Sequence, residues 1–226
     1  MKLASGRAVL AATLAAMVLA SGCGPRGSAV VVDLSQTPRS YAPSDYRTVL
    51  ARWTRRALIT RDFDTSLDVA ATFKSHDFRW AYSVRYSAQY QLSTADQDKL
   101  LKQQLAELDA AYEFVVSAAA TRFEWIDFQK KDSVWRIRLL DDRGHEVAPM
   151  EVRKLKTPVA ELEAFFPPST RSQPMASFYT TYLMRFPRKL PDGSPLDLEH
   201  AGKVTIRFAG VLGAAELNWV IKPATP

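Results

Sequence analysis

Three histidines and a short acidic run are the side chains of this chain with the clearest capacity for metal chemistry. His76, His145 and His200 lie far apart in the sequence, and none falls in a recognised metal-ligand spacing. The acidic run begins like a calcium loop, but Leu67 stands where an EF-hand needs glycine and Phe73 where it needs glutamate. The sequence therefore predicts no metal site, and we interpret the acidic run as a corner between two elements.

The motifs of the common enzyme classes are missing. The chain has no G-x-S-x-G elbow, no S-x-x-K with its partner motifs and no glycine-rich phosphate loop. The two carboxylates of a glycoside hydrolase are recognised by their separation in the folded protein, and a sequence does not reveal that separation. We therefore expect a non-enzymatic protein without a cofactor, and a hydrolase is the least favoured alternative.

Cys23 is the only cysteine, and it follows a segment with the three parts of a secretory signal peptide. Lys2 and Arg7 form a basic head, residues 8–19 are almost purely apolar, and the small residues 20–22 lead into the cysteine. The apolar run is too short to span a membrane. A conventional signal peptidase would also accept this site, so an ordinary secreted protein is the alternative.

The arrangement resembles the lipobox of bacterial lipoproteins, with Ala20 where that family usually has leucine. The resemblance implies that Cys23 becomes the N-terminus after cleavage and carries diacylglycerol and a further acyl chain, which hold the protein on a lipid bilayer. Gly24 stands where inner-membrane lipoproteins have aspartate, which implies sorting to the outer membrane, with the domain facing the periplasm. Lipidation would also remove the liability of a free exported thiol.

The composition is that of a folded, basic domain. Of 226 residues, 47% are hydrophobic and 24% charged, which suffices for a core and excludes global disorder. Removal of residues 1–22 takes away Lys2 and Arg7 and lowers the net charge from +6 to +4. Nucleic acid is not an expected partner of such an exported protein; the basic charge either meets phospholipid headgroups and acidic envelope polymers or, as is more common, consists of scattered solvated arginines.

We divide the chain into a signal peptide (1–22), an acylated cysteine with a flexible tether (23–44) and a single β-rich domain (45–226). The tether is rich in glycine, proline and serine, although residues 29–34 could add an edge strand. At the start of the domain, apolar spacing predicts an amphipathic basic helix over 45–61. This helix either packs on its own domain or lies on an anionic surface.

A helical hairpin is expected next, over residues 76–91 and 93–111. Ser93 and Asp96 form a capping-box pattern for the second helix, whereas residues 78–90 alternate in a way that also fits a strand. Strands are predicted from alternating apolar residues over 67–73, 113–119, 133–140, 146–155, 178–186, 204–208 and 217–221.

These elements predict an α+β fold. About seven short strands with turn signals between them favour an antiparallel β-sandwich of immunoglobulin-like architecture, with an N-terminal helix and an inserted helical hairpin. The Cys…Trp…Cys pattern of antibody domains is absent from the sequence.

Four aromatic residues of the first hairpin helix, Trp80, Tyr82, Tyr86 and Tyr90, are the candidate ligand-binding residues. Flat rings stack on sugars and fill apolar pockets, so these side chains could line a groove. The alternative interpretation is that the helix needs them to cover the core.

The signal segment, the sandwich and the missing catalytic motifs together predict a non-enzymatic envelope lipoprotein that presents its domain to a protein partner. Sheet edges and loops of sandwiches commonly make such contacts. The alternative is a binding module for an envelope glycan or lipid, which would use the aromatic residues and the basic helix.

Overall fold

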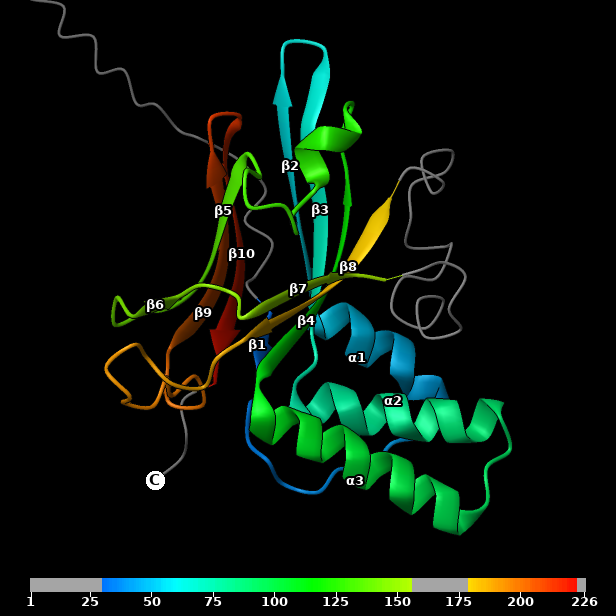
Figure 1. The fold of residues 1–226 in the computed structure, drawn as a ribbon. Helices are drawn as coiled ribbons and strands as arrows, with labels where there is room; N and C mark the ends of the chain where they lie inside the picture. The colour runs from blue at the N-terminus through cyan, green and yellow to red at the C-terminus, as the bar shows by residue number, and fades with distance from the viewer. Residues whose placement is uncertain (1–29, 156–178, 223–226) are drawn as a thin grey trace, which may run out of the picture.

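The computed structural model describes residues 30–155 and 179–222, which form two mostly antiparallel sheets with helices at one side (Figure 1). The first sheet has the order β1-β10-β9-β5-β6 and the second β2-β3-β4-β8-β7. The strands of the first sheet are β1 (Val31–Val32), β10 (Gly213–Ile221), β9 (Lys203–Gly210), β5 (Trp135–Asp141) and β6 (Glu146–Val147). Those of the second are β2 (Thr54–Arg61), β3 (Asp64–Phe73), β4 (Tyr112–Ala119), β8 (Thr180–Phe186) and β7 (Glu151–Lys154).

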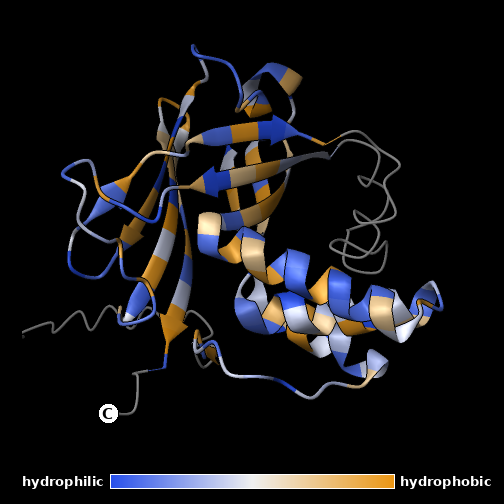
Figure 2. Cartoon of the chain, turned by 60° about the horizontal axis from the view of Figure 1, so that its bottom comes forward, coloured by the Kyte–Doolittle hydropathy of each residue, from blue (hydrophilic) through white to orange (hydrophobic). Residues whose placement is uncertain are grey.

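The core lies between the two sheets and is rich in aromatic rings. Phe73 of β3 stacks on Phe114 of β4 with ring centroids 4.5 Å apart, and Phe114 meets Trp219 of β10 at 5.4 Å. Strand side chains alternate between the two faces of a sheet, so every second residue of β4 points away from this core. Figure 2 shows the resulting alternation of hydrophobic and hydrophilic residues along the strands. The coarse prediction of an α+β two-sheet sandwich is confirmed.

The helical hairpin is also confirmed, as α2 (His76–Gln89) and α3 (Thr94–Ala110). Each helix begins at a serine whose hydroxyl accepts a backbone N–H, from Phe78 to Ser75 and from Asp96 to Ser93, both at 3.2 Å. The two helices lie side by side at one end of the strands (Figure 1). The helical interpretation of residues 78–90 is therefore the right one.

The predicted helix over 45–61 is wrong in its second half. Helix α1 (Tyr46–Trp53) follows the 3₁₀ turn η1 (Pro43–Asp45) and ends where the Thr54 hydroxyl donates to Leu50 O at 2.7 Å. Residues 54–61 form β2 instead and pair antiparallel with β3. Sheet pairing and the β-branched residues of 54–61 outweigh the apolar spacing. The predicted basic helix face is therefore divided between a helix and an edge strand.

The predicted strand over 146–155 is two strands in different sheets. β6 pairs with β5, and β7 pairs with β8. Pro149 lies between them and has no backbone N–H to donate to a ladder, which favours a break at this point. The described residues hold ten strands rather than about seven, and β1 and β6 contain only two residues each.

Part of the predicted tether packs against the domain. β1 pairs parallel with β10, and Val32 and Leu34 are buried. Farther along, the Tyr41 hydroxyl donates to the Asp77 carboxylate of α2. No helix within the described ranges is long and apolar enough to cross a membrane.

Candidate functional site

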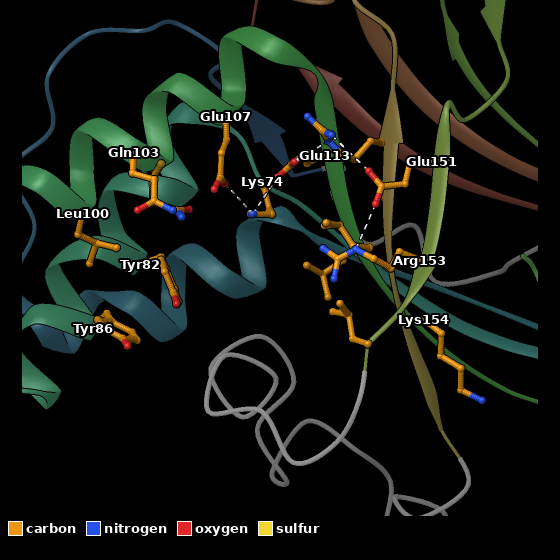
Figure 3. Close-up of a pocket in the computed structure, with 15 residues that line it drawn as sticks. Lys74, Tyr82, Tyr86, Leu100, Gln103, Glu107, Glu113, Glu151, Arg153 and Lys154 are labelled. Carbon is orange, nitrogen blue, oxygen red and sulfur yellow. Dashed lines mark hydrogen bonds and ion pairs between the residues drawn. The ribbon is translucent and has the colours of Figure 1, made fainter.

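A cavity of about 920 Å³ lies between the helical hairpin and the outer face of the second sheet (Figure 3). Its walls come from α2, α3, β4, β8 and β7. Alternation along β4 explains the sheet side of the wall: Phe114 points into the core, so Glu113 and Val115 face the cavity. The volume suits a ligand of small-molecule size, for which pockets of roughly 300–1,000 Å³ are typical.

A buried ion-pair cluster forms one wall. Glu113 Oε2 lies 2.8 Å from Lys74 Nζ and 2.7 Å from Arg79 Nη2, and the side chain of Arg79 is fully buried. Burial by itself would raise the pKa of the Glu113 carboxyl, but the charges and hydrogen bonds of Lys74 and Arg79 outweigh burial and lower that pKa. Glu113 is therefore a carboxylate whose Oε2 is held by Lys74 and Arg79.

Helix α3 adds a second carboxylate to the cluster. Glu107 Oε2 lies 2.9 Å from Arg79 Nη1 and 3.5 Å from Lys74 Nζ, and Gln104 Oε1 accepts from Arg79 at 3.1 Å. Arg79 also donates through Nε to Lys74 O at 2.9 Å. Hydrogen bonds thus occupy all three nitrogens of the buried guanidinium, and its main effect is to hold α2, α3 and β4 together.

Strands β7 and β8 supply the opposite wall. Arg185 bridges Glu113 and Glu151: its Nε lies 3.0 Å from Glu113 Oε1, and its Nη1 lies 3.3 Å from Glu151 Oε2. The Nε contact is Coulombic, because its angle does not make a hydrogen bond. Arg153 Nε donates to Glu151 Oε1 at 3.1 Å. Figure 3 shows Arg153 extending from β7 towards the hairpin, whereas Lys154 points away.

Two of the four predicted aromatic residues reach the cavity. Tyr82 and Tyr86 line it from α2, whereas Trp80 packs beside His76 with ring centroids 5.5 Å apart and, like the exposed Tyr90, is not part of the wall. Tyr82 is only 4% exposed and contacts the rings of Tyr46 and Phe78, so it serves the core as well. Tyr86 is half-buried and lies between Tyr82 and Tyr90, at 5.7 Å and 4.4 Å.

Sequence reasoning missed the charged residues of the site. The one available signal was Glu113, the single charged residue of a mostly apolar strand, because such a group must find a cation when the strand is buried. No comparable sequence pattern identifies Lys74 and Arg79 as its partners. Cys23, the predicted lipid-attachment residue, lies outside the described residues.

The arrangement favours binding over proton transfer. Glu107 and Glu113 are both held by cations, and the three histidines lie elsewhere: His145 Nδ1 is 2.7 Å from Asp141, His200 Nδ1 is 2.8 Å from Asp197, and His76 is stacked on Trp80. Burial lowers the pKa of His76, which favours its neutral form. Within the described ranges, no three His, Cys, Asp or Glu side chains form a group suited to a metal ion.

Comparisons of the chain with family models, with curated proteins and with solved structures return no match.

Proposed function

We propose that the protein is an exported lipoprotein, anchored through acylated Cys23 on the periplasmic face of the outer membrane, whose domain binds an envelope glycan without catalysing a reaction. The cavity carries this proposal, because it combines the ring of Tyr86 with charged and amide side chains in one space. Proteins bind sugars through such a combination of flat rings and polar groups. We extend the proposal to the fold by treating the two-sheet domain as an immunoglobulin-like binding scaffold.

The lining favours a glycan over the acyl chain of a lipid. Gln103 and Gln104 offer amide donors and acceptors, and Lys74, Glu107 and Arg185 place charges on the walls. Sugar hydroxyls use such groups well, whereas burial of an acyl chain beside them would cost the desolvation of each charge. The apolar lining residues Leu100, Val115, Leu155 and Leu183 lie among these charged groups and could contact the flat face of a sugar ring.

Sedimentation with insoluble envelope polymers tests this function. The full chain, extracted in detergent, is mixed with purified peptidoglycan sacculi or with lipopolysaccharide aggregates and centrifuged. We expect retention on at least one polymer and its loss in Tyr86→Ala, with Trp80→Ala as the matched control because Trp80 lies on the same helix outside the cavity. Absence of the wild-type protein from both pellets contradicts the proposal.

A second candidate function, presentation of the domain to a protein partner, is favoured by a separate observation. Three exposed apolar residues, which we call the apolar tip, lie in turns at one end of the domain: Phe63, Phe123 and Val211, exposed by 107%, 61% and 82%. Figure 1 shows the β2–β3 turn, the β9–β10 turn and η2 (Phe123–Ile126) at this same end. Exposed apolar clusters of this kind mark interaction sites.

Contacts between the loops support this grouping. Thr65 at the start of β3 and Thr121 before η2 exchange hydrogen bonds, from Thr121 N to Thr65 O and from Thr65 N to Thr121 Oγ1, both at 2.9 Å. On the other side, Gly213 at the start of β10 packs against Ile59 of β2. The β2–β3 turn is thus connected to both neighbours that complete the apolar tip.

A further inference from the structure

We infer that the glycan bound in the cavity is acidic and that the Arg153 guanidinium receives its carboxylate or phosphate group. This inference rests on the proposed glycan-binding function and adds the chemical class of the ligand. It follows from the charge balance of the walls, from the geometry of Arg153 and from the position of Arg153 opposite Tyr86.

The cavity and the ion-pair cluster behind its wall together carry one more positive than negative charge. Lys74, Arg153 and Arg185 line the cavity, Arg79 lies fully buried behind the wall, and the carboxylates are Glu107, Glu113 and Glu151. Lys154 is not counted, because it points away from the cavity (Figure 3). Each carboxylate already lies within 3.5 Å of at least two cations. An anion that enters the cavity therefore meets excess positive charge and carboxylates that are already neutralised.

Arg153 is the cation that is best placed to use this excess. Among the described residues its only ion pair runs through Nε to Glu151, so the two terminal nitrogens hold no carboxylate there. The guanidinium extends into the cavity from β7 (Figure 3), and its side chain is 57% exposed, so a ligand can reach it. Two parallel N–H groups of one guanidinium match the two oxygens of a carboxylate or phosphate.

Glu151 orients the Arg153 side chain and does not occupy the terminal nitrogens that would bind the ligand. Its two oxygens hold Arg153 Nε at 3.1 Å and Arg185 Nη1 at 3.3 Å, which fixes the direction of the Arg153 side chain before the ligand arrives. Opposite, the half-buried Tyr86 offers a ring for the sugar. An acidic saccharide could therefore stack on Tyr86 and place its acid group on the terminal nitrogens of Arg153, whereas a neutral glycan would leave those nitrogens without an anionic partner.

Paired polymers with and without acid groups test the inference. Sedimentation of the full chain in detergent is measured with native sacculi and with sacculi whose carboxyl groups have been amidated. The same measurement uses native and dephosphorylated lipopolysaccharide, so that the two arms separate a carboxylate from a phosphate. Arg153→Gln is compared with Arg153→Lys, which keeps the positive charge but loses the two parallel N–H groups of the guanidinium. Lys102→Gln is the control, because Lys102 is an exposed cation of α3 outside the cavity.

We expect binding to one native polymer, with affinity reduced about tenfold by neutralisation of that polymer or by Arg153→Gln, since a charge-assisted hydrogen bond contributes roughly 1.5 kcal/mol or more. Arg153→Lys should fall between, and Lys102→Gln should bind as wild type. Equal binding to native and neutralised polymer, with Tyr86→Ala still defective, overturns the acidic ligand and keeps the glycan site. No binding to any of the four polymers overturns the proposed function itself.

Discussion

Arg79 Nη2 lies 2.7 Å from Glu113 Oε2, with the two side chains 0% and 4% exposed. This pair joins α2 to β4 across a separation of 34 residues in the sequence. In α3, Gln104 and Leu108 are the only buried residues, so apolar contact alone gives this helix little hold on the domain. Helix α3 therefore depends on the buried ion-pair cluster for its position, whereas α2 is also held by Phe78, Ala81 and Tyr82 in the core.

Removal of the Glu113 carboxylate should destabilise the domain. We expect Glu113→Ala to lower the free energy of unfolding by about 3 kcal/mol, because it removes the buried carboxylate and leaves Lys74 and Arg79 with only the partly exposed Glu107 as a carboxylate partner. Urea denaturation followed by circular dichroism measures this. Arg207→Ala is the control, since Arg207 and Glu216 form an exposed pair at 2.8 Å and exposed pairs contribute about 1 kcal/mol or less. An equal loss of unfolding free energy in the two variants would contradict a larger stabilising role for the buried Glu113 than for an exposed ion pair.

The same pair predicts how stability depends on pH. Because the folded-state pKa of Glu113 is lowered, its contribution is present above the unfolded pKa of about 4.3 and is lost as the pH falls through the folded value. We expect the stability gap between wild type and Glu113→Gln to be largest near pH 7 and to shrink below about pH 4. Urea midpoints measured from pH 3 to pH 7 test this, with Glu216→Gln as the exposed control. A gap that is constant across this range would count against the assignment.

The two cavity tyrosines should separate folding from binding. If both tyrosines only lined a binding groove, loss of Tyr82 and Tyr86 would leave folding intact, but Tyr82 is 4% exposed and packs on Tyr46 and Phe78. We therefore expect Tyr82→Ala to destabilise the domain by about 3 kcal/mol or more, as truncation of a buried aromatic does. Tyr86→Ala should cost less stability and abolish retention on the glycan. Thermal melts of the two variants beside the sedimentation assay distinguish these outcomes.

Patterns of local sequence predicted most of the fold, and contacts between distant segments decided the rest. The hairpin could be predicted from the Ser93–Asp96 capping pattern and from helical apolar spacing, whereas the Ser75 cap of α2 is seen only in the structure. The end of α1 at Trp53 could not, because the strand after it also depends on pairing with β3, a distant contact that the local sequence does not show. Part of the cavity lining could be predicted. Tyr82 and Tyr86 follow helical spacing and can be named from the sequence, whereas Arg153 reaches the cavity only because β7 pairs with β8.

The apolar tip should matter for partner binding and not for stability. Phe63 is fully exposed and Val211 is 82% exposed, so Phe63→Ser with Val211→Ser should change the free energy of unfolding by less than about 1 kcal/mol. Crosslinking in intact envelopes, followed by mass spectrometry, is expected to capture one stoichiometric protein with the wild type and to lose it with the double variant. Ala106→Ser, at an exposed position of α3 away from this end, is the control. Capture of the same background proteins by all three forms would remove the second candidate function.

The membrane anchor is tested at Cys23 itself. Two or more acyl chains hold a protein almost permanently on a bilayer, because each buried methylene contributes about 0.8 kcal/mol. We therefore expect the wild-type protein to sediment with outer membranes and to incorporate radiolabelled palmitate, and Cys23→Ser to do neither. Globomycin, which blocks the lipoprotein signal peptidase, should cause the precursor to accumulate. The alternative of an ordinary secreted protein predicts normal processing in globomycin and a soluble periplasmic product, so the two experiments together separate a lipidated cysteine from a cleavage site that merely precedes one.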